Sequence, residues 1–188
     1  EREVPGENKA GLSGKSIGNL PLETSETMNG MWGYKVEDQN YKSTQELIQL
    51  LVRTAAKGAN LLLNIGPQPD GNLPNAALER LRSMGEWLHS RAGESIYGTK
   101  AGSVAMGDSI VSTQSNDGKC LYIHLLKAQT SATSITLPME VHRFKRVTTL
   151  MNSEAVTYKY DKKRKQTTFY LPKRKENELT DFIIKLNK

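Results

Sequence analysis

Carboxylates are the first residues in the chain that could do chemistry. Glu1, Glu3, Glu23 and Glu26 lie in a stretch with no regular apolar period. General acid/base catalysis needs a carboxyl group in a partly dry environment, within reach of a leaving-group oxygen. A glutamate in a loop is more often just a solvated charge, so spacing alone does not select one of the four.

Two aromatic rings follow between glycines, in the segment Asn29-Gly30-Met31-Trp32-Gly33-Tyr34. An indole and a phenol on a loop suit the apolar C–H face of a sugar, and the phenol hydroxyl can form a hydrogen bond. The alternative is an aromatic anchor that only packs the loop onto its own domain. Trp32 and Tyr34 are therefore the candidate ligand-binding residues.

A third segment, Asn64-Ile65-Gly66-Pro67, closes a short apolar run. If that run is a parallel strand, the segment lies at its carboxyl end, where α/β proteins gather their ligands. A plain strand-to-loop turn explains the same residues and is favoured by the residues alone.

Several other chemistries find little support. The basic clusters at 162–165 and 173–175 could bind nucleic acid, but they lack interleaved aromatic residues and fit solvated charge at hairpin tips better. His89, His124 and His142 lie far apart, and Cys120 is the single cysteine, so no metal site is expected. Glycine-rich phosphate motifs and other cofactor signatures are not evident either.

The elements that would position these residues change character near residue 98. Ser43 and Glu46 form a capping-box pair before a helical apolar period, and Gly58 suits the residue just past that helix. The run 60–65 is typical of a buried parallel strand, and a second helix with Pro74 in its first turn follows. The first 40 residues look like one long loop. Helix, strand and helix in this order indicate an α/β unit.

From residue 98 onward the pattern predicts only strands, at 103–106, 110–114, 120–126, 134–137, 144–150, 155–160, 167–171 and 182–186. Polar turns at 116–118 and 161–165 separate some of them, and short, regularly spaced strands favour an antiparallel β-sandwich. Charge changes at the same place, since residues 98–188 hold 16 Lys or Arg against 8 Asp or Glu. We therefore expect two domains, 1–97 and 98–188.

Length limits what the first domain can be. The chain has 188 residues, 37% of them hydrophobic, which is enough for one or two globular domains. A complete (β/α)₈ barrel needs roughly 250 residues, so this chain cannot be one. No apolar run approaches the length of a membrane-spanning helix, and no targeting signal is readable.

Several segments together resemble one known family. They are residues 22–34 (Leu-Glu-Thr-Ser-Glu-Thr-Met-Asn-Gly-Met-Trp-Gly-Tyr), residues 57–67 (Lys-Gly-Ala-Asn-Leu-Leu-Leu-Asn-Ile-Gly-Pro), Asp70-Gly71, residues 85–88 and residues 93–99. In order and spacing they resemble the C-terminal part of the α-L-fucosidases of glycoside hydrolase family 29. Ser25 departs from the family, where Cys is common, and so does Ala59, where Gly is common.

The resemblance implies a retaining exo-glycosidase that removes terminal α-L-fucose from glycans with two carboxylates. It implies an end portion of a (β/α)₈ barrel over 1–97 and a β-sandwich over 98–188. No residue here matches the family's nucleophilic aspartate, which we expect upstream of this chain, in the missing barrel segment of the same protein. Glu1 matches the acid/base position and is favoured over Glu23, the second candidate. Trp32 matches a sugar-packing aromatic residue.

The expected partner is a fucosylated glycan, with no cofactor, nucleic acid or membrane, and the glycan substrate suggests a secreted or periplasmic protein. We expect the chain alone to be inactive. The alternatives are a non-catalytic carbohydrate-binding or structural module derived from such an enzyme, and a basic nucleic-acid binder whose affinity would collapse with salt.

Overall fold

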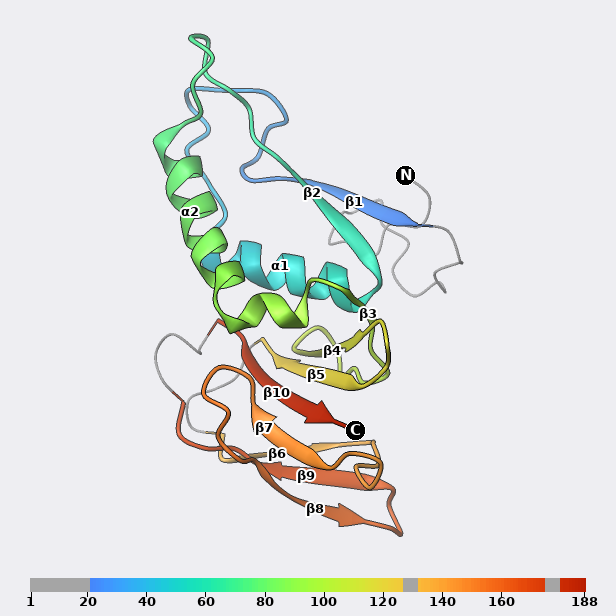
Figure 1. Ribbon diagram of the computed structural model, residues 1–188. Coiled ribbons are helices and arrows are strands. Elements are labelled where there is room, and N and C mark those ends of the chain that lie inside the picture. Colours follow the sequence, from blue (N-terminus) through green and yellow to red (C-terminus); the bar gives the residue numbers. More distant parts are fainter. Residues whose placement is uncertain (1–20, 127–131, 175–179) are drawn as a thin grey trace. The chain divides into compact units, whose positions relative to one another are not determined.

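The computed structural model describes residues 21–126, 132–174 and 180–188 (Figure 1). The chain divides into two compact units, Glu1–His89 and Ser90–Lys188. Among the described residues, no helix is long and apolar enough to cross a membrane. Glu1 and Glu3 lie outside the described residues.

Unit 1 is a parallel strand pair connected and followed by helices. Its elements are β1 (Leu22–Thr27), α1 (Thr44–Ala56), β2 (Ala59–Asn64) and α2 (Asn75–His89). Leu22 lies opposite Ala59 and Thr27 opposite Asn64, so the two strands end together at their carboxyl ends. Parallel strands need a crossover, and α1 supplies it. Helix α1 packs against β2, and α2 packs against α1.

The predicted start and end of α1 are confirmed. The Ser43 hydroxyl accepts a hydrogen bond from the Glu46 N–H at 3.2 Å, and the Glu46 carboxylate accepts one from the Ser43 N–H at 2.7 Å. These hydrogen bonds from Ser43 hold the pKa of Glu46 below its usual value. Gly58, just past the C-cap Lys57, has φ +77°, a left-handed conformation that costs glycine little.

The prediction of an unbroken loop over the first 40 residues is wrong at residues 22–27. This segment, Leu-Glu-Thr-Ser-Glu-Thr, is strand β1, paired with β2 along its whole length. Its sequence has no apolar alternation because the residue buried against the helices is Thr24, at 0% exposure. The ladder with β2 makes it a strand, and that partner lies more than thirty residues away in the sequence.

The two faces of the strand pair differ. Thr24 and Ala59 lie on the face that is buried, whereas Glu23 and Asn60 lie on the other face and are exposed. Leu62 is on that second face, and half of its surface is exposed. The run 60–65 is therefore a parallel strand, as predicted, but only one of its faces is covered by the described residues.

Unit 2 is an antiparallel β-sandwich. After a short 3-10 helix, η1 (Arg91–Ser95), it contains β3 (Thr99–Ala101), β4 (Ile110–Ser115), β5 (Cys120–Leu125), β6 (Ser134–Leu137), β7 (Arg146–Thr149), β8 (Thr157–Asp161), β9 (Gln166–Tyr170) and β10 (Phe182–Asn187). One sheet has the order β3-β4-β5-β10-β7 and the other β6-β9-β8. All neighbouring strands pair antiparallel.

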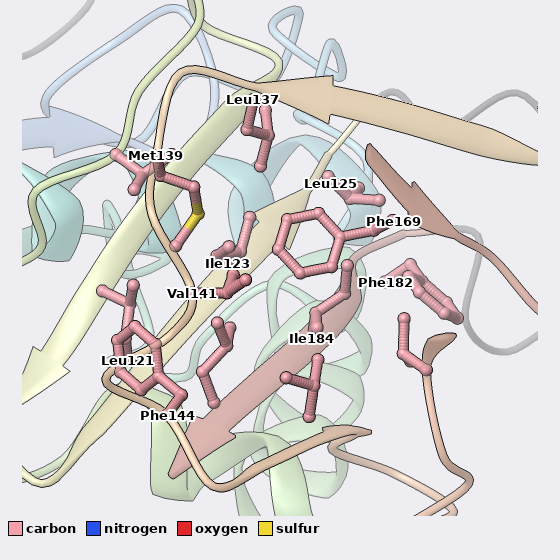
Figure 2. Close-up of a cluster of buried hydrophobic side chains, with 14 residues drawn as sticks. Leu121, Ile123, Leu125, Leu137, Met139, Val141, Phe144, Phe169, Phe182 and Ile184 are labelled. Atoms are coloured by element: carbon pink, nitrogen blue, oxygen red, sulfur yellow. The ribbon is translucent and has the colours of Figure 1, made fainter. Parts of the chain in front are cut away.

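A single apolar core joins the two sheets of unit 2. Phe169 of the three-stranded sheet and Phe182 and Ile184 of the five-stranded sheet are almost completely buried in it (Figure 2). Inward-facing residues alternate with outward-facing ones along β9, where Thr167 and Phe169 are buried and Tyr170 is exposed. The sandwich expected from strand spacing is confirmed.

One predicted strand of unit 2 is wrong. Residues 103–106 form only an isolated bridge at Met106, and the first strand is instead β3. The Ser112 hydroxyl accepts from the Val104 N–H and donates to the Val104 carbonyl, at 2.9 and 2.7 Å. A side chain thus takes the place of a neighbouring strand for this residue, which an apolar pattern cannot reveal.

Candidate active site

The loop that follows β1 begins at the carboxyl end of the strand pair and is organised by the Thr27 hydroxyl. The Thr27 oxygen lies 2.8 Å from the Asn29 carbonyl oxygen and 2.9 Å from the Met31 carbonyl oxygen, and it accepts from the Asn29 N–H at 3.2 Å. The Met28 N–H donates to the Asn64 carbonyl at 3.0 Å. The chain therefore turns sharply as it leaves β1.

Asp38 closes the same loop from its far side. Its carboxylate accepts from the Gly30 N–H at 2.9 Å and from the Asn40 N–H at 3.3 Å. A Cβ atom on Gly30 would lie 2.9 Å from the Asp38 Oδ2 atom, so glycine permits the close approach. The Asp38 side chain thus connects the two ends of the loop by a hydrogen bond, and no local sequence pattern predicts this bond.

The end of β2 fixes the backbone around Trp32. The Asn64 side-chain amide donates to the Trp32 carbonyl at 2.7 Å. A Cβ atom on Gly66 would lie 2.4 Å from the Gly33 carbonyl carbon and from the Tyr34 nitrogen, so the two backbones touch directly. The segment Asn64-Ile65-Gly66-Pro67 is thus more than a turn, because it holds the aromatic loop in place.

The backbone of the aromatic loop is fixed while its apolar side chains are exposed. Trp32 is 57% exposed, and Met31 and Val36 are also largely exposed. Tyr34 is half-buried. An exposed indole ring on a fixed backbone segment offers an open apolar face, which suits the stacking of a sugar ring. Both predicted ligand-binding residues lie at the carboxyl end of the strand pair.

The carboxylates near this loop are arranged differently. Glu23 is exposed near the start of β1, opposite Asn60, about 13 Å of strand before Thr27. Glu26 is half-buried and lies 3.5 Å from the Lys42 ammonium, which also donates to the Thr27 carbonyl at 2.6 Å. Glu23 and Trp32 are therefore at opposite ends of the strand, and Glu26 already has a cationic partner.

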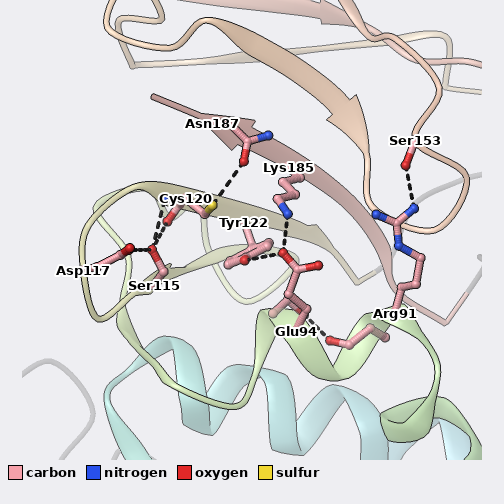
Figure 3. A network of polar contacts seen from close by, with 11 residues as sticks. Arg91, Glu94, Ser115, Asp117, Cys120, Tyr122, Ser153, Lys185 and Asn187 are labelled. Carbon is pink, nitrogen blue, oxygen red and sulfur yellow. Dashed lines mark hydrogen bonds and ion pairs between the residues drawn. The ribbon is translucent and has the colours of Figure 1, made fainter.

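Unit 2 contains a polar network around Glu94 (Figure 3). One Glu94 carboxylate oxygen accepts from the Tyr122 hydroxyl at 2.7 Å and from the Lys185 ammonium. Burial alone would raise the pKa of Glu94, but the hydrogen bonds from Lys185 and Tyr122 outweigh it and hold that pKa below the usual value. The network connects η1 to β5 and β10, so its role is structural.

A second polar chain is buried next to η1, on the face of the five-stranded sheet opposite the apolar core. The Asp181 Oδ2 atom lies 2.7 Å from the His124 Nδ1 atom, and the His124 Nε2 atom lies 3.2 Å from the Thr113 hydroxyl. The sequence of contacts Asp181–His124–Thr113 resembles a hydrolase triad. All three residues are buried, however, and the Thr113 hydroxyl donates its hydrogen bond to the Ser95 carbonyl. No substrate reaches these groups. No cluster of His, Cys, Asp and Glu suited to a metal ion occurs in the described part of the chain.

Comparison with known proteins finds relatives of this chain. A family model for alpha-L-fucosidase matches residues 1–94. The plasma alpha-L-fucosidase of Rattus norvegicus is 49% identical over 70 residues, which are 36% of this chain and 15% of that protein.

Solved structures extend the likeness over both units. Alpha-L-fucosidase isoenzyme 1 from Paenibacillus thiaminolyticus matches with a TM-score of 0.78 and 28% identity, covering 89% of this chain and 40% of that one. The alpha-L-fucosidase of Vibrio sp. strain EJY3 matches with a TM-score of 0.77 and 27% identity, covering 91% of this chain and 30% of that one.

These relatives are glycoside hydrolases. With half of its length matched by the family model, the chain belongs to the alpha-L-fucosidase family. It spans well under half the length of the relatives and structures it matches.

Proposed function

We propose that this chain forms part of a retaining, exo-acting α-L-fucosidase that hydrolyses terminal α-L-fucosyl linkages of glycans. The observation that carries the proposal is the family match over residues 1–94. The arrangement of the Trp32 loop supports it, because the backbone that carries an exposed aromatic ring is fixed at the carboxyl end of parallel strands.

In this proposal residues 1–97 are the last part of a (β/α)₈ catalytic barrel, and residues 98–188 are its C-terminal sandwich. The order β1-α1-β2-α2 is that of two consecutive barrel units. In such a barrel, helices cover the outer face of each strand, and the other face points into the barrel. The exposed face with Glu23, Asn60 and Leu62 would then be the one that looks into the barrel.

Trp32 and Tyr34 would bind the sugar. The Trp32 ring offers an apolar platform for the C–H face and the methyl group of fucose, and the Tyr34 hydroxyl can hydrogen-bond to a ring substituent. Asn64 and Gly66 act on the substrate only through the Trp32 backbone, which makes them positioning residues.

Retention needs a nucleophile and an acid/base with carboxyl groups about 5–5.5 Å apart. We assign the nucleophile to a segment that this chain does not include and the acid/base to Glu1, with Glu23 as the second candidate. The position of Glu23 supports this ranking, since about 13 Å of strand separates it from the end that holds the Trp32 loop.

Substitution in the intact enzyme tests the assignment. Glu1→Ala should lower kcat for substrates with poor leaving groups by about 10²–10⁴-fold, and azide should restore turnover of an activated aryl fucoside. Glu37→Ala is the control, because Glu37 is an exposed glutamate on the loop after β1. Azide rescue of Glu23→Ala instead would transfer the role to Glu23. Full activity in both variants would contradict the assignment of either glutamate.

The main alternative is a non-catalytic carbohydrate-binding module derived from such an enzyme. The observation in its favour is the same held aromatic loop, which can bind a sugar without the chemistry. Equilibrium binding of fucose by an intact protein that shows no hydrolysis of an aryl fucoside would support this alternative.

A further inference from the structure

The turn between β8 and β9 concentrates positive charge at one end of the sandwich. Lys162, Lys163, Arg164 and Lys165 are consecutive and exposed. Asp161 holds them in one turn, because its carboxylate accepts from the N–H groups of Lys163 and Arg164 at 2.9 and 3.1 Å. None of the ion pairs formed among the described residues engages these four cations.

A neighbouring loop adds charge of the same sign. The Tyr160 hydroxyl donates to the Glu140 carboxylate at 3.0 Å, and the Tyr160 and His142 rings are 6.3 Å apart. These contacts fix the loop beside the end of β8. The loop also carries Arg143 and Lys145, which are exposed. The charge near this end of β8 is therefore mostly positive, with Glu140 as the acid of the same loop.

Protection of a sheet edge explains only part of this pattern. Natural proteins place lysines along edge strands to prevent strand pairing. Lys159, on the edge strand β8, fits that role. The four cations at 162–165 lie in a turn that offers no strand edge, and their mutual repulsion costs stability.

The outer face of the three-stranded sheet continues from the turn. Lys159, Thr168 and Thr136 lie side by side across β8, β9 and β6, and the two threonine hydroxyl oxygens are 2.8 Å apart. The next row on the same face is centred on Tyr170, which is 48% exposed. Figure 1 shows this sheet and its β8–β9 hairpin within unit 2. Cations, hydroxyl groups and an aromatic ring thus follow one another along one surface.

We propose that this surface, formed by Lys159, the cations of residues 162–165, Thr168 and Tyr170 and here called the basic hairpin surface, binds sulfated glycan chains. Sulfate groups pair with the cations of the turn. Sugar hydroxyl groups meet Thr168, and a sugar ring packs on Tyr170. The choice of a glycan over a nucleic acid rests on the proposed function and on the absence of aromatic residues among the four cations for stacking bases.

The test measures binding of the intact enzyme to a fluorescent heparin oligosaccharide, used as the sulfated probe, at about 50 and about 200 mM salt. Lys163→Gln together with Arg164→Gln should raise Kd about tenfold or more. The matched control is Arg82→Gln with Lys100→Gln, which removes one exposed arginine and one exposed lysine elsewhere and should change Kd less than about twofold. Circular dichroism confirms that each variant is folded.

Two further measurements distinguish specific glycan binding from nonspecific electrostatic attraction. Tyr170→Ala should weaken heparin binding several-fold at both salt concentrations, whereas Tyr97→Ala, which removes another exposed tyrosine of unit 2, should not. The desulfated oligosaccharide should bind much more weakly than heparin. Equal Kd values for the lysine–arginine variant and its control, or no effect of Tyr170→Ala, would overturn the proposal. So would duplex DNA of matched length binding more tightly than heparin, which would assign the surface to nucleic acid.

A hydrolysis assay of the intact enzyme distinguishes failure of the heparin-binding proposal from failure of the proposed fucosidase function. Lys163→Gln with Arg164→Gln should leave turnover of a small aryl fucoside unchanged, because these residues lie in the sandwich unit. Heparin binding without any fucoside hydrolysis would count against the fucosidase proposal alone. Hydrolysis without heparin binding would count against the basic hairpin surface alone.

Discussion

Glu94 shows how much one carboxylate oxygen can organise. It accepts hydrogen bonds from Tyr122 and Lys185, and the Lys185 ammonium lies 5.8 Å from the centre of the Tyr122 ring. Burial and the neighbouring Glu94 carboxylate raise the pKa of Tyr122 far above its ordinary value, so the phenol stays a donor at any physiological pH. Part of the contact between η1 and the five-stranded sheet therefore depends on the charge of Glu94, and the hydrogen bond from Thr113 to the Ser95 carbonyl supplies another part.

Glu94→Gln should make that dependence measurable. The variant keeps an acceptor oxygen but loses the charge, so the free energy of unfolding at neutral pH should fall by about 1 kcal/mol, allowing for solvent screening at an exposed carboxylate. The pKa of Glu94 is lowered in the folded state, so its contribution is present above the unfolded pKa and is lost as pH falls through the folded pKa.

Urea denaturation from neutral to acid pH checks this expectation. The difference between the parent chain and Glu94→Gln should shrink as the pH falls. Glu86→Gln, at an exposed position of α2, should match the parent throughout. A difference that stays constant down to acid pH would show that the charge of Glu94 is not what stabilises the network.

Single residues also mark the limit of sequence-based prediction. The roles of Trp32 and Tyr34 follow from residue type and remain predictions, whereas their placement at the carboxyl end of the strands is observed. Asp38, which fixes Gly30 from eight residues away, has no local signal because its partner is a backbone N–H group. Asn64 was recognisable as a strand end, but its bond to the Trp32 carbonyl depends on how the chain folds back.

Among the elements, the loop after β1 depends on its direct backbone contact with the end of β2. Gly66→Ala would place a Cβ atom 2.4 Å from the backbone at Gly33 and Tyr34, where no flexible side chain can move away. The substitution should lower the free energy of unfolding by about 1–3 kcal/mol. In the intact enzyme it should also raise KM for a fucoside, because the Trp32 loop must shift.

Gly85→Ala is the matched control. Gly85 lies within α2, and a Cβ atom there would meet nothing within 4 Å. This change should stabilise the chain by about 0.5–1 kcal/mol, since alanine favours the helix. Thermal unfolding of both variants checks the pair, and a Gly66→Ala variant as stable as the parent would contradict the contact.

Elements were predictable wherever their signals were local. The capping box of α1, the hairpin turn near Gly118 and the polar turn after Asp161 each combine cap or turn residues within a few positions. β1 was not predicted as a strand because its fully buried residue, Thr24, is polar and gives no apolar signal. β3 was not predicted because it is only three residues long. The apolar residues after it resemble a strand in sequence, and the Ser112 hydroxyl bonds both backbone groups of Val104.

At the scale of the whole molecule, the two units carry different properties. The basic excess of residues 98–188 lies with the sandwich, and the candidate sugar-binding loop lies in unit 1. The fold class of the sandwich could be predicted because its strands are short and regularly spaced, with local turn signals near Gly118 and after Asp161. The fold class of unit 1 could not be predicted from its strands alone, because two parallel strands occur in many α/β folds. The expectation of a barrel came from the resemblance to a family.

The 188-residue chain by itself should not hydrolyse an aryl α-L-fucoside. One of the two carboxylates that the proposed retaining mechanism needs has no match in it, and the described part of unit 1 has a sheet of two strands, too few for the proposed barrel. The measurement is release of the aryl alcohol, with the intact enzyme as positive control. Robust turnover by the chain alone would contradict the proposed division of the active site.

The half-exposed Leu62 has a further consequence. Together with the parallel pair β1 and β2 it presents an apolar side chain and unpaired strand edges within the described part of unit 1. Such edges recruit further strands, whether the correct ones or those of a second copy. Self-association and poor solubility are therefore to be expected wherever this face of unit 1 is left uncovered, and in the proposed fucosidase the remaining barrel strands would cover it.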